Sequence, residues 1–586
     1  MNLVSGRWVS LAALALVIGA IAGPAAAAHR DILATSQAEL GGSHPYADFL
    51  VGRFALAQGD FSTASQALNA AVAADPTNSD LRDQAFRIGI LNGDIDQAYG
   101  VAKGLDNASD TTRLMTPLVG AVTALKAGRG GAAVKSLDAV LTISPNERNA
   151  ELLRPFALAM AGQWKTAFDE SGDAALAADD GDRLLAYLVK AERARLLELK
   201  HNPEAADALY KTLYQPGAAT FIFGPDYAAF LERQDRKAEA RVVWQAIADQ
   251  THDTVAAQAV ARIDGTDYHK PALPDLKAST AQALFLSATI SFSEHDSEMA
   301  LASLRLSLYL DDSSDRAHIL LGQIEDSLKN TQSAEAAWAS VPATSPYYGE
   351  AVLRQVTSLK ARDAKVEAMA LLDTILAKDP DNLGFIIEKA GLLHDETHDT
   401  QALALINDRI TRAGDKDFTW TAWFLQAVIY DSMDQWDNAE VSIKKAQALA
   451  GQRPEVLNFL GYGWINRGLH INEGMDLIRQ ALNITPKSGA IIDSLGWGYY
   501  KLGQYDQALS FVEQAVTMEP SDAEINEHLG DVYKALGRDA EAGYEWQRVL
   551  TLDTTDKQAV EVRAKLDANA KALKISAAEP TGAAKN

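Results

Sequence analysis

Residues 489–522 read GAIIDSLGWGYYKLGQYDQALSFVEQAVTMEPSD, and this stretch decides the fold. Apolar and small residues recur three and four positions apart, once before Gly503 and once after it, which is the spacing of one helix face. Gly503 is suited to end the first helix in a left-handed cap, and Glu519-Pro520 to stop the second. The stretch therefore predicts two helices joined by a tight turn.

The same pattern returns along the chain with a regular period of roughly 34 residues, the length of a helix–turn–helix repeat. Leu529 and Gly530 stand one such period after Leu495 and Gly496. Near the other end, alanines keep the same step at Ala64, Ala98 and Ala132. Extending this register predicts repeat starts near residues 45, 79, 113, 148, 186, 221, 281, 315, 349, 383, 420, 454, 489 and 523. One helix pair cannot bury its apolar stripe alone, so neighbouring pairs are expected to stack.

The arrangement of Leu495-Gly496, Tyr499, Ala508 and Pro520 resembles the tetratricopeptide repeat. The resemblance implies an all-α fold, a superhelical solenoid of antiparallel helix pairs with about 12–14 repeats in two arrays. Small residues such as Gly496 and Ala508 are expected where the two helices of a pair cross. These repeat residues therefore indicate packing and not chemistry.

The register divides the chain into five predicted segments. Residues 1–28 are predicted as a cleaved signal peptide, 29–254 as an N-terminal array and 255–280 as a connector. The connector carries residues that the register does not place, including Pro271-Ala-Leu-Pro274. Residues 281–566 are predicted as a C-terminal array, and 567–586 as a disordered tail.

Residues 1–28 have the three parts of a secretory signal. Arg7 supplies a positive charge, residues 8–22 are uncharged and largely apolar, and Gly23-Pro24 precedes four alanines suited to cleavage. The apolar stretch is shorter than the roughly 18–20 residues of a membrane span, so a retained anchor is the weaker alternative. The sequence therefore predicts export to the periplasm, with no integral span once the signal is removed.

Composition narrows the chemistry further. The 586 residues carry a formal net charge of −24, which disfavours binding to nucleic acid or to anionic lipid. The chain has no cysteine, so disulfides, thiolate metal sites and a thiol nucleophile are excluded. A lipid anchor carried on a cysteine is excluded for the same reason.

Two stretches partly match motifs of enzymes or cofactor-binding proteins, but each lacks a residue that its motif requires. His394 and His398 lie four apart, but the intervening glutamate is at neither position that a zincin motif requires. Residues 128–136 have glycines before a lysine, but a phosphate loop needs glycine immediately before that lysine and Val134 stands there. We therefore expect no enzymatic activity, no metal and no cofactor.

A partner is expected on the inner, concave face of the solenoid, which the first helix of each pair lines. Counted from each predicted repeat start, positions 2, 5, 9 and 12 of the tetratricopeptide template point into this face. We apply this numbering to the pairs that start at 420, 454 and 489. The predicted partner-binding residues are Phe424, Asn458, Tyr462, Asp493, Trp497 and Tyr500. Aromatic anchors beside an amide and a carboxylate are typical of a surface that binds a peptide or helix. The alternative is that neighbouring helices cover several of these side chains.

The C-terminal repeats carry a narrower resemblance. The runs 458–462 (Asn-Phe-Leu-Gly-Tyr), 492–497 (Ile-Asp-Ser-Leu-Gly-Trp) and 527–531 (Glu-His-Leu-Gly-Asp) resemble bacterial envelope tetratricopeptide proteins. These include lipoprotein adaptors that bind a periplasmic carboxyl-terminal processing protease, although this chain lacks their lipid-bearing cysteine. The resemblance implies an exported scaffold that binds an envelope protease or its substrates. The alternative is a structural factor acting with peptidoglycan, outer-membrane or polysaccharide-export machinery.

Overall fold

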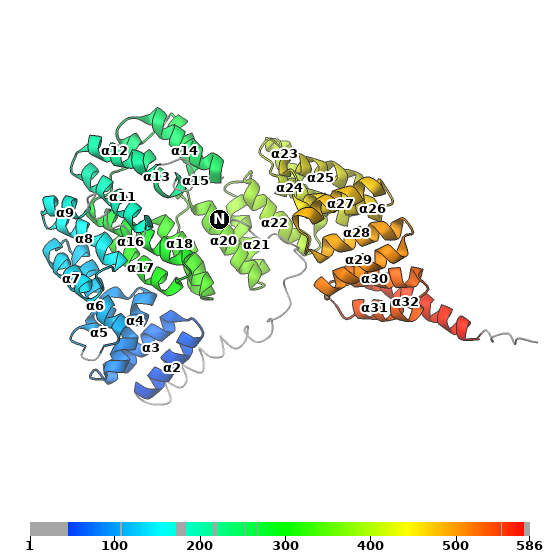
Figure 1. The fold of residues 1–586 in the computed structure, drawn as a ribbon, viewed down its shortest axis with the longest axis horizontal. Coiled ribbons are helices and arrows are strands. Elements are labelled where there is room, and N and C mark those ends of the chain that lie inside the picture. Colours follow the sequence, from blue (N-terminus) through cyan, green and yellow to red (C-terminus); the bar gives the residue numbers. More distant parts are fainter. Residues whose placement is uncertain are drawn as a thin grey trace, which may run out of the picture. The chain divides into compact units, whose positions relative to one another are not determined.

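The computed structural model describes residues 45–105, 108–171, 183–214, 220–251, 254–266, 268–552 and 554–578. Every regular element in these ranges is a helix, 30 in all, and no strand occurs among them (Figure 1). The predicted signal peptide lies outside the described residues. The all-α solenoid of helix pairs that the repeating register predicts is confirmed.

Fourteen helices are the first members of pairs. They are α2 (Pro45–Ala57), α4 (Ser79–Asn92), α6 (Asp110–Lys126), α8 (Arg148–Met160), α11 (Arg183–Leu199), α13 (Thr220–Arg233), α16 (Leu276–Ser293), α18 (Asp315–Ser327), α20 (Tyr348–Ala361), α22 (Leu383–Asp395), α24 (Trp420–Ser432), α26 (Pro454–Asn466), α28 (Gly489–Lys501) and α30 (Ala523–Ala535). Each begins close to a predicted repeat start, so the register follows the structure from end to end.

The second helices and two further helices complete the set. The second helices are α3 (Phe61–Ala74), α5 (Ile95–Ala102), α7 (Gly130–Ile143), α9 (Trp164–Glu170), α12 (Pro203–Leu213), α14 (Lys237–Thr251), α17 (Ser297–Leu310), α19 (Thr331–Ala339), α21 (Lys365–Leu376), α23 (Asp399–Ala413), α25 (Trp436–Ala450), α27 (Ile471–Ile484), α29 (Tyr505–Met518) and α31 (Asp539–Val549). The further helices are α15 (Thr254–Asp264) and α32 (Asp556–Ala578).

Contacts divide the chain into two units, with the boundary between Ala364 and Lys365. We call residues 45–364 the N-terminal unit and 365–578 the C-terminal unit. The boundary falls inside a helix pair and not at the expected connector. Within that 255–280 segment, α15 is helical to Asp264 and α16 begins at Leu276. Helix α32 continues to Ala578, so the described part of the expected tail is helical as well.

Local signals explain the helix ends. In α4 the Asn78 side chain accepts hydrogen bonds from two backbone N–H groups of the first turn, and Gly93 ends the helix in the left-handed conformation. In other pairs the same turn position is taken by a non-glycine residue at positive φ, such as Asp363 at 60° or Asp434 at 58°. These residues carry the strain that glycine avoids.

Small residues lie where the helices of a pair cross, as the sequence predicts. A Cβ on Gly496 would come within 2.6 Å of the Val512 side chain on the second helix. A Cβ on Gly530 would come within 2.5 Å of the Trp546 indole, and one on Gly322 within 2.1 Å of Trp338. The absence of a side chain on the first helix therefore lets the second helix bring a large apolar group into the crossing.

The N-terminal unit closes on itself. Helices α16 and α17, the seventh pair, contact the first helices α4, α6, α8 and α11 of earlier pairs (Figure 1). The Arg305 guanidinium on α17 donates to the carbonyl of Leu91 at 3.0 Å, and Asn149 on α8 donates to the Ser303 hydroxyl at 3.1 Å. Leu304 and Leu306 on α17 are fully buried in the cores that result. The surface that the first helices would line is therefore covered from within the chain.

Candidate protein-binding surface

In the C-terminal unit the first helices of successive pairs contact one another: α22 with α24, α26 with α28, and α28 with α30. Template positions 2, 5 and 9 of α24, α26, α28 and α30 form what we call the first-helix surface. Its residues are Thr421, Phe424, Val428, Glu455, Asn458, Tyr462, Ala490, Asp493, Trp497, Glu524, Glu527 and Asp531, and we include Tyr500 at position 12 of α28. The character of this surface changes from apolar on α24 to acidic on α30.

At the α24 end the surface is aromatic. Phe424 meets Phe459 edge-on at 5.5 Å between ring centroids and Trp420 at 6.3 Å. The Phe424 and Val428 side chains remain partly exposed. This end can therefore seat apolar side chains of a partner.

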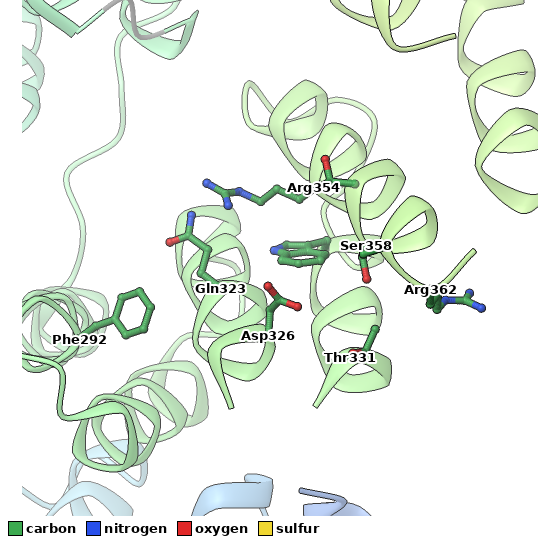
Figure 2. A pocket seen from close by; sticks show the side chains of 10 residues that line it. Phe292, Gln323, Asp326, Thr331, Arg354, Ser358 and Arg362 are labelled. Atoms are coloured by element: carbon green, nitrogen blue, oxygen red, sulfur yellow. The ribbon is translucent and has the colours of Figure 1, made fainter. Parts of the chain in front are cut away.

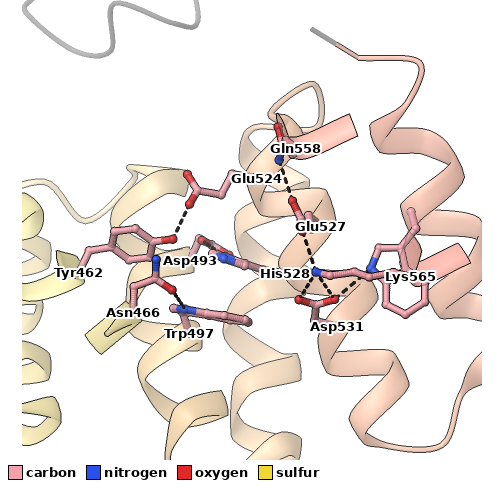
Figure 3. A network of polar contacts seen from close by, with 11 residues as sticks. Tyr462, Asn466, Asp493, Trp497, Glu524, Glu527, His528, Asp531, Gln558 and Lys565 are labelled. Carbon is pink, nitrogen blue, oxygen red and sulfur yellow. Dashed lines mark hydrogen bonds and ion pairs between the residues drawn. The ribbon is translucent and has the colours of Figure 1, made fainter. Parts of the chain in front are cut away.

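Aromatic stacking organises the middle of the surface. The Trp497 indole lies between two rings, stacked on Tyr500 at 4.4 Å and on the imidazole of His528 at 3.9 Å. Its Nε1 donates to Asn466 Oδ1 at 3.1 Å (Figure 3). Both faces of the indole are thus occupied, and only 6 % of Trp497 is exposed.

The structure places the six predicted residues on one surface but does not expose them equally. Asp493 is only 4 % exposed, and Trp497 is also buried, so for these two the alternative of coverage by neighbouring helices applies. Phe424, Asn458 and Tyr500 are partly exposed, as is Tyr462. The accessible part of the predicted set is therefore the aromatic edge, because the amide oxygen of the partly exposed Asn458 is itself buried.

A buried ion pair joins two first helices. His528 Nδ1 on α30 lies 2.7 Å from Asp493 Oδ2 on α28 (Figure 3). Burial by itself lowers the pKa of His528, but the hydrogen-bonded Asp493 carboxylate outweighs burial and raises the pKa to about 9. His528 is therefore an imidazolium at neutral pH, pressed against the face of Trp497. No template position singles out His528, and its role is not among the sequence predictions.

The hydroxyl of Tyr462 on α26 reaches past α28 and donates to the Glu524 carboxylate on α30. Position 2 of the intervening helix α28 is the small Ala490. Burial and the nearby Glu524 carboxylate raise the pKa of Tyr462 well above its ordinary value. Tyr462 is therefore a neutral hydrogen-bond donor at any physiological pH.

The acidic end of the surface is closed by the last helix. Lys565 on α32 lies 2.6 Å from Glu527 Oε1 and 2.6 Å from Asp531 Oδ2, and Gln558 donates to Glu527 at 2.8 Å (Figure 3). Glu527 and Asp531 therefore share one lysine within the chain. Glu524 differs from them, because it is exposed and forms no ion pair among the described residues.

Three acceptor atoms on this surface have no donor. Asn458 Oδ1 and Asp493 Oδ1 are buried atoms without a hydrogen-bond partner among the described residues. Glu524 accepts from Tyr462 through Oε1, and no described donor reaches its second oxygen. An unmade hydrogen bond at a buried acceptor costs about 1–3 kcal/mol, so this surface favours a partner that brings N–H groups.

The N-terminal unit has a hollow of about 570 Å³ between α18, α19 and α20 (Figure 2). Two guanidiniums line it, but each is already paired: Arg354 with Glu350 at 2.7 Å and Arg362 with Glu335 at 3.0 Å. Asp326 also lines the hollow, so its lining carries charges of both signs. The hollow lacks the row of partly exposed aromatic side chains that the first-helix surface has.

The two stretches that resemble a zincin motif and a phosphate loop have structural roles. His394 Nδ1 lies 2.6 Å from Asp399 Oδ1 across the turn between α22 and α23. Gly130 starts α7 against α8, where a Cβ would come within 2.4 Å of the Ala161 nitrogen. Among the described residues no group of three potential metal ligands occurs. In the same ranges, no helix combines the length and apolar character needed to cross a membrane.

Comparison with protein families accords with this geometry. The tetratricopeptide repeat model matches residues 494–557, which run from α28 to the start of α32. This segment has the tetratricopeptide repeat pattern. A TPR repeat-containing protein of Pseudomonas aeruginosa is 27% identical over 196 residues, which cover 33% of this chain and 32% of that protein. The match therefore spans about a third of each chain.

Alignments with solved structures of low sequence identity cover most of the chain. A chain of the APC/C Cut9–Hcn1 hetero-tetramer has 15% identity and a TM-score of 0.37, covering 91% of this chain and 98% of that one. Yeast Tom70 has 11% identity and a TM-score of 0.28, covering 91% and 96%.

Proposed function

We propose that this protein is an exported, non-enzymatic scaffold or adaptor that binds a protein partner in the concave groove of its C-terminal repeats. The observation that carries the proposal is the difference between the two units. In the N-terminal unit α16 and α17 cover the first helices. In the C-terminal unit the first-helix surface keeps Phe424, Tyr462 and Tyr500 partly exposed beside polar groups. Aromatic anchors with polar neighbours are the usual centre of a protein interface.

The kind of partner follows from the resemblance of the C-terminal repeats to envelope adaptors. We propose an envelope protease, or a substrate delivered to it, as the bound protein. Export rests on the signal-like residues 1–28 and would place the protein in the periplasm. Cell fractionation and N-terminal sequencing test this part, and we expect a mature chain that begins at His29. A chain that keeps residues 1–28 would contradict cleavage.

The binding site is tested by affinity isolation from cell-envelope extract, read by mass spectrometry. The bait is the mature chain, and the variant is Phe424→Ala with Tyr500→Ala. The matched control is Val441→Ala with Leu449→Ala on α25, two apolar side chains that are 59% and 58% exposed. We expect the Phe424/Tyr500 variant to lose a protease that the parent and the control both retain. Equal capture by all three baits would overturn the assignment to the first-helix surface. Capture of envelope-assembly components in place of a protease would favour the structural role.

A further inference from the structure

The first-helix surface of the C-terminal unit has more acceptors than donors. His528 is committed to Asp493 through one carboxylate oxygen, and Lys565 is committed to Glu527 and Asp531. What remains without a donor is the second oxygen of Asp493, the Asn458 amide oxygen and the second oxygen of Glu524. Asp493 is only 4 % exposed, so its free oxygen is not satisfied by bulk water.

These acceptors lie beside aromatic rings. The Tyr462 hydroxyl contacts Glu524, and its ring centroid lies 6.2 Å from that of His528, which is in turn paired with Asp493 (Figure 3). An arginine guanidinium both donates several hydrogen bonds in one plane and stacks on aromatic faces. Lys501 lies over the Trp497 ring, 5.0 Å from its centroid, and makes no ion pair with Glu524.

We infer that this surface selects a basic peptide segment, whose arginine or lysine pairs with Glu524 and the neighbouring acceptors while its apolar residues lie on Phe424. The inference rests on the proposed function and adds the chemistry of the partner. The ligand is a stretch of protein chain with basic and apolar residues side by side, matching the acidic-to-apolar gradient from α30 to α24. The net charge of −24 on the whole chain also attracts such a segment from a distance.

Glu524 makes the first contact because it is the exposed member of the group. The Tyr462 hydroxyl uses one carboxylate oxygen of Glu524, so an incoming cation pairs with the second oxygen. Glutamine at 524 would still accept from Tyr462 but would no longer attract a cation, so Glu524→Gln separates the two roles.

The test uses the full mature chain and synthetic peptides of about twelve residues. Each peptide has a block of leucine and phenylalanine and a block of three charged residues, in either order. The charged residues are arginine in one pair of peptides and glutamate in the other. Fluorescence anisotropy gives the Kd. We expect the better arginine peptide to bind at least tenfold tighter than both glutamate peptides, with an affinity that falls as salt is added.

Two variants locate the effect. Glu524→Gln with Asn458→Ala should weaken the arginine peptide about tenfold and leave the glutamate peptides unchanged. The control, Asp437→Asn with Asp506→Asn, removes two exposed carboxylates from the second helices α25 and α29 and should change neither. Circular dichroism checks that each variant remains helical.

Three outcomes overturn the inference. In the first, arginine and glutamate peptides bind equally. In the second, the Asp437/Asp506 control weakens the arginine peptide as much as the Glu524/Asn458 variant does. In the third, no peptide binds. The proposed function is judged separately, because a natural partner captured through Phe424 and Tyr500 would stand even if its segment proved acidic or uncharged.

Discussion

The two units are built from the same helix pair and use its first helices differently. In the N-terminal unit the first helices face the chain's own α16 and α17, and Leu304 and Leu306 fill the space between them. In the C-terminal unit they face one another's polar and aromatic groups, through the Asp493–His528 and Tyr462–Glu524 contacts. A repeat therefore fixes the pair and its stacking, while the residues at its inner positions decide whether the surface becomes core or interface.

The largest effect should come from emptying the N-terminal core. Leu304→Ala removes a fully buried side chain from α17 and should cost about 2–5 kcal/mol. Hydrogen exchange read by mass spectrometry should show α4 and α6 losing protection together with α17, while α26 to α30 keep theirs. Loss confined to α16 and α17 would mean that the earlier pairs do not depend on them, and the contrast between the units would weaken.

The buried Asp493–His528 ion pair should make the free energy of unfolding of the C-terminal unit depend on pH. We expect no corresponding contribution in the N-terminal unit. The pKa of His528 is about 9 in the folded protein and about 6.5 in an unfolded chain. The stabilisation is therefore complete below pH 6.5 and is lost as pH rises to 9, by an amount on the order of 3 kcal/mol. Urea unfolding of the C-terminal unit between pH 6 and 9.5 measures it.

In an Asp493→Asn variant this dependence should be largely absent, because the neutral amide no longer holds the proton on His528. Asp506→Asn, an exposed change on α29, serves as the control and should keep the parent's pH profile. A parent whose stability is flat over the same interval would contradict the pairing.

Substituting the glycines at the helix crossings tests whether the two units share the same packing within a pair. Gly322→Ala in the N-terminal unit and Gly530→Ala in the C-terminal unit each force a methyl group against a tryptophan of the second helix. Overpacking of this kind costs about 1–3 kcal/mol, and we expect similar losses in both units by thermal unfolding. A loss in only one unit would show that the pair itself is not equivalent across the chain.

The smallest effect is expected at the surface. Arg148 and Glu294 form an ion pair at 3.1 Å within the N-terminal unit, with the glutamate side chain 52% exposed. Glu294→Gln should change the free energy of unfolding by less than about 1 kcal/mol. A larger loss in urea unfolding would mean that polar contacts, and not the leucines of α17, hold the closed unit together.

Much of the fold could be predicted because it is repeated. The step from Ala64 to Ala98 to Ala132 and the Leu-Gly pairs at 495 and 529 mark the register, and all fourteen predicted starts fall at a first helix. The closure of the N-terminal unit could not be predicted in this way. The contact from Arg305 to Leu91 spans 214 residues, and no local pattern records it.

The candidate surface shows the same limit. Template positions placed Tyr462, Asp493 and Trp497 on one surface, since position alone decides which way a helical side chain points. The burial of Asp493 and Trp497 could not be read from position, because it depends on His528 of the next pair, which stacks on Trp497 and pairs with Asp493. The only sequence signal for this burial was His528, which lies next to a template position in the following pair.

The closure of the N-terminal unit has a consequence for how the chain folds. Early pairs cannot complete their cores until α17 has been made, because Leu91 must wait for Arg305, far along the chain. Contacts so distant in sequence form slowly, because a long loop must close before they contribute. The C-terminal pairs pack mainly on their immediate neighbours and can form one after another. The first half of the protein should therefore be the last part to complete its hydrophobic cores.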